Sequence, residues 1–157
     1  MSQLLSLPDE AATRKLGAAL AADIAPGRVI FLSGDLGAGK TTLVQGLVRA
    51  LGFTGRVKSP TYSLVELYKL SSLNLYHFDF YRFEDRSEWV ESGFREYFSQ
   101  DSACVVEWPE RVAGLLAPPD LELRLDFSGT GRQARLTAQT AAGRDWLTAA
   151  SKRWSRA

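Results

Sequence analysis

Residues 34–41 of the chain read Gly34-Asp35-Leu36-Gly37-Ala38-Gly39-Lys40-Thr41. This run fits the pattern Gly-x-x-x-x-Gly-Lys-[Ser/Thr], the phosphate-binding P-loop motif. Glycine tolerates the backbone angles at which successive N–H groups point inward, so such a turn binds an anion through its main chain. The motif therefore predicts a site for a nucleoside triphosphate.

The segments on either side of this run support that prediction. Residues 28–33 are apolar and rich in strand-forming types, and residues 41–51 carry apolar side chains at helical spacing. A strand, a glycine-rich turn and a helix in this order put the positive end of the helix dipole at the phosphates. We expect Lys40 to reach the β- and γ-phosphates as an exposed charge, and the Thr41 hydroxyl to bind Mg²⁺.

Length and composition narrow the class of protein. The 157 residues fit a single domain spanning 1–157, long enough to bury a real core. The 19 basic and 18 acidic residues leave a formal charge of +1, so no global field favours nucleic acid or a membrane. A single cysteine, Cys104, excludes an internal disulfide and suits a reducing compartment. With neither a membrane-length apolar run nor a signal peptide, we expect a cytoplasmic protein.

The charged residues are unevenly distributed along the chain. Residues 77–110 contain nine acidic and three basic side chains, whereas residues 132–157 contain six basic and one acidic. A solvated helix end explains the basic tail most simply, and contact with RNA or an acidic partner is the alternative.

Periodicity and turn residues predict the remaining elements. They are a helix from Asp9 to about Ile24, a hairpin of residues 63–70 and 73–80, one or two short helices within 84–101, a buried strand at 103–106, a short helical piece after Pro109, a hairpin of residues 121–127 and 132–139, and a helix at 142–154. A βα unit combined with hairpins predicts a three-layer α/β fold of the P-loop NTPase type with a mixed sheet.

Two strand-end carboxylates are candidates for the Mg²⁺ or water-orienting group that such an enzyme needs. Glu107 closes a continuous apolar run, as in a strand buried on both faces. Asp79 ends a segment that alternates, and is therefore less typical of a central parallel strand. On pattern, Glu107 is the better metal ligand.

Several other residues allow two interpretations each. Ser59-Pro60-Thr61-Tyr62 lies where nucleotide switches often sense the γ-phosphate, and it is equally consistent with a plain Ser-Pro turn. For His77 a packed strand histidine is favoured over a catalytic one, and for Cys104 a buried, inert thiol. Trp108 either covers the site, contacts a partner or packs in the core.

Taken in order along the chain, four motifs together resemble the TsaE (YjeE) family. They are residues 34–42, ending in Thr42; Lys58-Ser59-Pro60-Thr61-Tyr62; Tyr76-His77-Phe78-Asp79-Phe80-Tyr81-Arg82; and Val106-Glu107-Trp108. The first motif is common to P-loop proteins, whereas the four motifs in series are specific to this family. The resemblance extends from Pro8 to Thr140. Phe80 stands where Leu is more usual, an exchange of one apolar residue for another.

What this resemblance implies goes beyond the spacing of residues. The family is a small bacterial ATPase with a P-loop α/β fold, needed to make threonylcarbamoyladenosine beside the tRNA anticodon. The resemblance implies binding of ATP and ADP with Mg²⁺, feeble hydrolysis alone, and dependence on the TsaB–TsaD pair. It implies that the ATPase resets that complex between turnovers and meets tRNA only through it.

Carried over position by position, the resemblance also implies site residues. Thr41 and Glu107 would hold Mg²⁺, Asp79 would lie at the nucleotide, and Glu10 and Arg132 would contact the nucleotide. With the motif, this gives Lys40, Asp79 and Glu107 as catalytic candidates. Which of the two carboxylates is catalytic and which binds metal stays open at this point.

Two other classes of function remain open. A small-molecule kinase would transfer phosphate to a bound acceptor and consume ATP without any protein partner. A nucleotide-gated binding protein would engage TsaB–TsaD identically with ATP or a non-hydrolysable analogue.

Overall fold

The structure is a computed structural model that describes residues 1–99 and 101–156. Their strands form one seven-stranded mixed sheet in the order β1-β7-β6-β2-β5-β4-β3. The bounds are β1 Ser2–Leu7, β2 Val29–Gly34, β3 Val65–Lys69, β4 Asn74–Asp79, β5 Ser102–Glu107, β6 Leu121–Ser128 and β7 Gly131–Ala138. Strands β6, β2, β5 and β4 run parallel to one another, and β1, β3 and β7 pair antiparallel.

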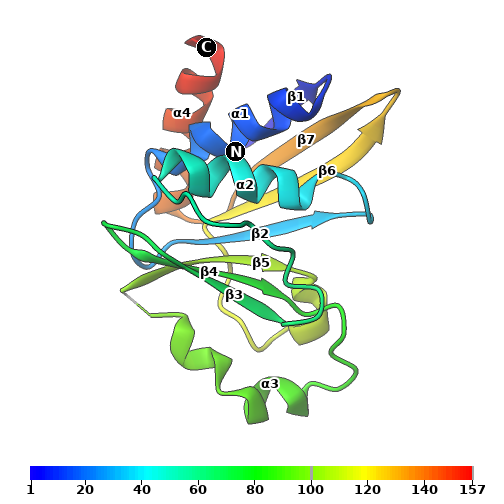
Figure 1. The fold of residues 1–157 in the computed structure, drawn as a ribbon, viewed down its shortest axis with the longest axis vertical. Helices are drawn as coiled ribbons and strands as arrows, with labels where there is room; N and C mark the ends of the chain where they lie inside the picture. Colours follow the sequence, from blue (N-terminus) through cyan, green and yellow to red (C-terminus); the bar gives the residue numbers. More distant parts are fainter. Residues whose placement is uncertain (100, 157) are drawn as a thin grey trace.

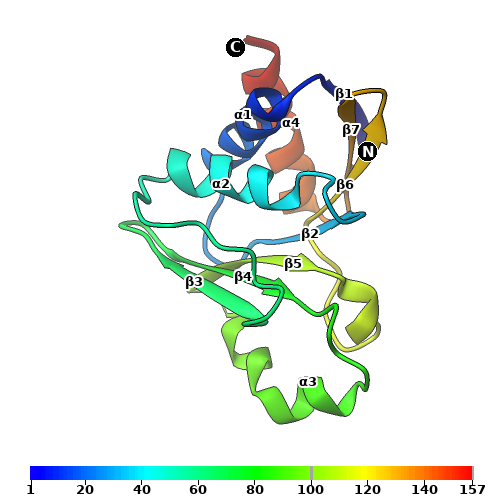
Figure 2. The same cartoon turned by 45° about the vertical axis from the view of Figure 1, so that its right-hand side comes forward.

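Helices cover both faces of this sheet, which gives three layers (Figures 1 and 2). The bounds are α1 Glu10–Ala21, α2 Lys40–Ala50, α3 Ser87–Ser92 and α4 Ala141–Arg156, with 3₁₀ turns η1 Phe94–Tyr97 and η2 Pro109–Val112. Helices α1, α2 and α4 lie on one face, and α3 lies on the other. Among the described residues no helix is long and apolar enough to cross a membrane.

Two hydrophobic clusters correspond to these two faces. The larger joins α1, α2 and α4 to the sheet through residues such as Leu16, Leu47 and Trp146. The smaller packs Phe78 and Val106 of the sheet against Trp89 of α3. Because successive side chains of a strand point to opposite faces, β4 and β5 contribute alternate residues to each cluster.

Most predicted elements are confirmed. Both hairpins form, with β3 paired to β4 and β6 to β7, and the helices within 84–101 are α3 and η1. The Asp9 side chain caps α1 by accepting the N–H of Ala12 at 2.9 Å. That helix ends at Ala21 rather than near Ile24, although Ile24 still packs in the larger cluster.

Two features differ from the sequence predictions. Strand β1 had no predicted counterpart, because its pairing with β7 joins residues more than a hundred positions apart. The direction of β4 in the sheet was also not predicted: it runs parallel to β5, although it is not a central strand, as its alternation indicated. Its alternation reflects its position second from the edge, where β3 pairs antiparallel on its other side.

Candidate functional site

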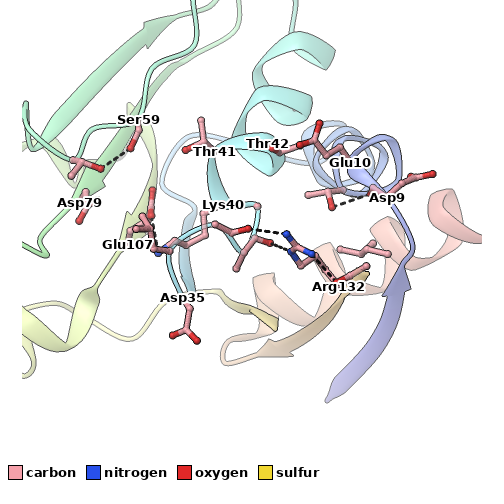
Figure 3. A pocket seen from close by; sticks show the side chains of 18 of the residues that line it. Asp9, Glu10, Asp35, Lys40, Thr41, Thr42, Ser59, Asp79, Glu107 and Arg132 are labelled. Carbon is pink, nitrogen blue, oxygen red and sulfur yellow. Dashed lines mark hydrogen bonds and ion pairs between the residues drawn. The ribbon is translucent and has the colours of Figure 1, made fainter. Parts of the chain in front are cut away.

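A cavity of about 1000 Å³ opens at the carboxyl ends of the parallel strands. Twelve of the predicted site residues line it: Glu10, Asp35, Leu36, Gly37, Ala38, Gly39, Lys40, Thr41, Thr42, Asp79, Glu107 and Arg132. Gly34 does not line the cavity, but its carbonyl accepts a hydrogen bond from Lys40 Nζ at 2.7 Å. Figure 3 shows side chains of this cavity, which come from the loop after β2 and from α1, α2, β4, β5 and β7.

Residues 34–41, hereafter the glycine-rich loop, connect β2 directly to α2. Gly37 and Gly39 have φ angles of +82° and +107°, a region that residues with a side chain rarely enter. The N–H of Ala38 closes a turn onto the Asp35 carbonyl at 3.0 Å. The loop therefore delivers the first turn of α2, with its unpaired N–H groups, to the cavity, where an anion would be stabilised.

Lys40 is held inside this site rather than exposed as we expected. Its side chain is only 11% exposed, and Nζ lies 3.3 Å from Oε1 of Glu107. The ring of Trp108 lies 5.2 Å from the same Nζ. The expectation was wrong because Lys40 lies against the buried carboxylate of Glu107, and the sequence does not show that these two residues are neighbours.

Glu107 is buried at the end of β5 and has a partner for each oxygen. Oε2 lies 2.5 Å from Nε2 of His77, which is itself fully buried, and Oε1 faces Lys40. Burial alone raises the pKa of the carboxyl, but the hydrogen bond and charge of His77, with the charge of Lys40, lower the pKa below its usual 4.5. Glu107 is therefore held as a carboxylate.

Asp79 lies opposite Glu107 in the register of β4 and β5. Its Oδ1 accepts the N–H of Tyr81 at 2.9 Å, and its own N–H donates to the carbonyl of Leu64 at 2.9 Å. Burial raises the pKa of Asp79 above 3.8, and the negative charge of Glu107 adds to the rise. The two carboxylates thus differ in electrostatics although they end neighbouring strands.

The segment 59–62 and Trp108 form part of the cavity rim. Ser59, Thr61 and Tyr62 line the cavity, and the Ser59 and Thr61 hydroxyls lie 2.8 Å apart. Tyr62 is 83% exposed. Trp108 belongs to neither hydrophobic cluster and lies against Tyr81, with 4.8 Å between ring centroids. Its placement at the rim favours a role in covering the site or meeting a partner over core packing.

The other predicted residues differ in how exposed their side chains are and in how many contacts hold them. The Glu10 side chain is 81% exposed and lies 3.7 Å from Arg14. The guanidinium of Arg132 donates to the carbonyls of Gly37, Ala38 and Gly131. Cys104 is buried, and burial raises the pKa of its thiol to about 12, as expected of an inert cysteine.

The donor set of the cavity is suited to Mg²⁺. In the described part of the chain no three His, Cys, Asp or Glu side chains cluster as a self-sufficient metal site. Thr41, Asp79 and Glu107, which carry oxygens of the kind that bind a hard cation, all line the cavity. Magnesium is typically held by one or two carboxylates, with waters and substrate phosphates completing its shell. These residues therefore fit Mg²⁺ bound together with a phosphate chain.

Sequence reasoning missed the part played by His77. We favoured a packed strand histidine; the ring is indeed buried, but it also holds Glu107. A signal was available, because His77 precedes Asp79 by two residues and so shares its face of the strand. Asp9, Thr13, Tyr81 and Thr130 also line the cavity. Tyr81 belongs to the third motif of the family resemblance, although no role was assigned to it, and no motif indicated Thr13 or Thr130.

Comparisons with known proteins agree on one family. Residues 7–136 match the family model described as "Threonylcarbamoyl adenosine biosynthesis protein TsaE". Proteins named "tRNA threonylcarbamoyladenosine biosynthesis protein TsaE" include one from Haemophilus influenzae, 44% identical over 78% of this chain and 78% of its own. The Bacillus subtilis protein of that name is 40% identical over 87% of this chain and 82% of its own. The crystal structure of Bacillus subtilis YdiB superposes with a TM-score of 0.84 at 29% identity, covering 97% of this chain and 95% of that one.

Proposed function

This chain belongs to the TsaE family, and from that premise we propose that it is a Mg²⁺-dependent P-loop ATPase required for threonylcarbamoyladenosine modification of tRNA. We further propose that it acts on the TsaB–TsaD complex to support repeated turnover. The names of the relatives support the role in tRNA modification. The cavity at the carboxyl ends of the parallel strands supports the ATPase activity.

One observation carries the ATPase proposal. The glycine-rich loop, Lys40 and two strand-end carboxylates meet in a single cavity although they come from three separate parts of the chain. Backbone N–H groups and a lysine neutralise a polyphosphate, and the oxygens of Thr41, Asp79 and Glu107 suit its metal ion. A cavity built only to bind an anion would have no use for two buried carboxylates.

The residues then divide into roles. Lys40 exchanges its contact with Glu107 for the β- and γ-phosphates of ATP. Thr41 and Glu107 would hold Mg²⁺, which when bound would screen the phosphate charge. Asp79, whose pKa is raised by burial, orients the attacking water. His77 holds the Glu107 side chain in place through the hydrogen bond between Nε2 and Oε2.

Dependence on a partner follows from what the cavity lacks. Its cationic lining residues, among those described, are Lys40 and Arg132. The guanidinium of Arg132 is engaged by main-chain carbonyls, so no free arginine faces the phosphates. P-loop hydrolysis is slow without such a group. We therefore propose that TsaB–TsaD completes or orders the site, through the rim formed by residues 59–62 and Trp108.

The test is steady-state phosphate release with and without the TsaB–TsaD pair, alongside tRNA modification over several turnovers. Slow basal release and clear stimulation are expected. Lys40→Ala should abolish release, whereas Lys69→Ala, which removes an exposed lysine of β3, should not. Rapid basal release that the pair leaves unchanged would favour a stand-alone ATPase or kinase. Equal modification with a non-hydrolysable analogue would favour a nucleotide-gated binding protein.

A further inference from the structure

Arg132 is bonded to the glycine-rich loop from a distant part of the chain. Its Nη2 donates to the Gly37 carbonyl at 3.0 Å and its Nε to the Ala38 carbonyl at 3.2 Å, across 95 and 94 residues of sequence. Its Nη1 donates to the Gly131 carbonyl at 2.9 Å. Figure 3 shows the guanidinium beside the loop, with dashed lines running to it. All three guanidinium nitrogens therefore have main-chain acceptors.

The guanidinium is itself held in place by the β6–β7 hairpin. Phe127 is the register partner of Arg132 across that hairpin, and its ring lies 4.4 Å from the guanidinium carbon. A cation over an aromatic face is attracted by the ring, and a hairpin paired on both sides is a firm support. Arg132 thus presents its donors to the loop from a fixed position.

Fixing these two carbonyls fixes two peptide planes. In a trans peptide the C=O of one residue and the N–H of the next point in opposite directions. The Gly37 plane directs the Ala38 N–H to the Asp35 carbonyl, where it closes the turn inside the loop. The Ala38 plane directs the Gly39 N–H to the side opposite Arg132.

The loop needs such support because glycines flank both planes. Gly37 and Gly39 have φ angles of +82° and +107°, and glycine reaches alternative angles at little energetic cost. Without an external bond these planes would rotate, which would open the turn closed by the Ala38 N–H and change the direction of the Gly39 N–H. The arginine's planar, forked donors match two neighbouring carbonyls in a way that a lysine ammonium does not.

We propose that Arg132 is a positioning residue: it holds the carbonyls of Gly37 and Ala38 so that the loop's N–H groups are set for a phosphate chain. This rests on the proposed nucleotide site and assigns Arg132 a different task there from the direct nucleotide contact implied by the family resemblance. Arg132 acts on the ligand indirectly, through the conformation of the loop. It therefore affects binding of the polyphosphate and not of the base.

The experiment is isothermal titration calorimetry with inorganic tripolyphosphate and with ADP. The variants are Arg132→Ala and Arg132→Lys, with Arg135→Ala as the matched control, since Arg135 is exposed on the same strand. Losing two hydrogen bonds to the loop should weaken both ligands about tenfold or more in both Arg132 variants. The control should bind as the wild type does.

Other outcomes would overturn the proposal. A loss of ADP affinity with tripolyphosphate affinity unchanged would mean direct contact with the nucleoside. Full rescue by Arg132→Lys would mean that only the charge matters. If the wild type binds neither tripolyphosphate nor ADP, the proposed nucleotide site is refuted; if it binds ADP but not tripolyphosphate, the site stands and the proposal that Arg132 sets the loop for the polyphosphate fails.

Amide hydrogen exchange of the ligand-free protein tests the positioning role independently of binding. Exchange at Ala38, whose N–H is bonded to the Asp35 carbonyl, should be at least about tenfold faster in Arg132→Ala than in the wild type, with exchange in the sheet unchanged. Unchanged exchange at the loop would overturn the proposal even if nucleotide affinity fell.

Discussion

Nε2 of His77 lies 2.5 Å from Oε2 of Glu107, and both side chains are buried on the face of the sheet that α2 covers. The other oxygen of Glu107 faces Lys40 at 3.3 Å. A buried carboxylate is thus held between a histidine and a lysine at the point where we place the phosphates. This arrangement exists because β4 and β5 run parallel and end together.

The first prediction concerns this pair. Replacing His77 with Ala should lower the free energy of unfolding at pH 7 by about 3 kcal/mol, because it leaves a buried charge with one partner fewer. The pKa of Glu107 is lowered in the folded state, so the pair stabilises the fold above pH 4.5 and loses that effect as the pH falls below it. Urea denaturation at several pH values measures this.

Leu75→Ala provides the control for the cavity that His77→Ala also creates. Leu75 is fully buried on the same strand and carries no charge. Its cost should stay constant with pH, whereas the cost of His77→Ala should shrink below pH 4.5. A pH-independent cost in both variants would show that His77 matters only for packing.

Asp79 should behave in the opposite way. Burial raises its pKa above 3.8, so the folded state binds this proton more tightly than the unfolded state does. Stability is therefore lost as the pH rises from 3.8 through the raised pKa. Asp79→Asn should raise the free energy of unfolding at pH 7 by on the order of 1 kcal/mol while lowering ATP turnover.

The gain from Asp79→Asn should disappear in thermal unfolding below pH 3.8, where the carboxyl of the wild type is protonated in both states. The asparagine keeps an oxygen that can accept the Tyr81 N–H, so the hydrogen bond is the same in the wild type and the variant. A variant that is less stable at pH 7 would contradict this account of the buried charge.

A third prediction separates the two carboxylates in metal binding. Glu107→Ala should mainly weaken the Mg²⁺ dependence of nucleotide binding, because a hard cation loses an oxygen ligand. Asp79→Ala should keep that dependence and lower turnover. Titration of Mg²⁺ against a fluorescent ADP analogue decides between them. The reverse pattern would exchange the roles of the two residues.

The fourth prediction concerns Trp108 at the cavity rim. Its φ angle of 56° is unusual for a residue with a side chain, and such strain is often kept at functional sites. Trp108→Ala should reduce the proposed stimulation by TsaB–TsaD at least about tenfold, as for an interface aromatic, while reducing basal hydrolysis less.

The control for Trp108 is Trp154, which packs near Lys15 on α1 and does not line the cavity. Trp154→Ala should leave stimulation intact. Phosphate release at saturating TsaB–TsaD measures both variants. Equal losses of basal and stimulated rates in Trp108→Ala would assign this tryptophan to the site itself and not to the contact with the partner.

By itself the sequence determined the local features of this protein. The glycine-rich loop, the helix after it, the Asp9 cap and the two hairpins depend on residues a few positions apart, and those residues are visible as motifs and turns. The continuous apolar run ending at Glu107 likewise predicted a strand buried on both faces, and β5 is fully buried.

Tertiary structure alone decided which of these pieces meet. Alternation along 74–79 reports which residues are buried, but strand order and direction depend on pairing between distant segments. The sequence therefore could not show that Asp79 lies opposite Glu107, or that His77 holds the latter. For the same reason the sequence could not show that a hairpin paired on both sides brings the guanidinium of Arg132 to the carbonyls of Gly37 and Ala38.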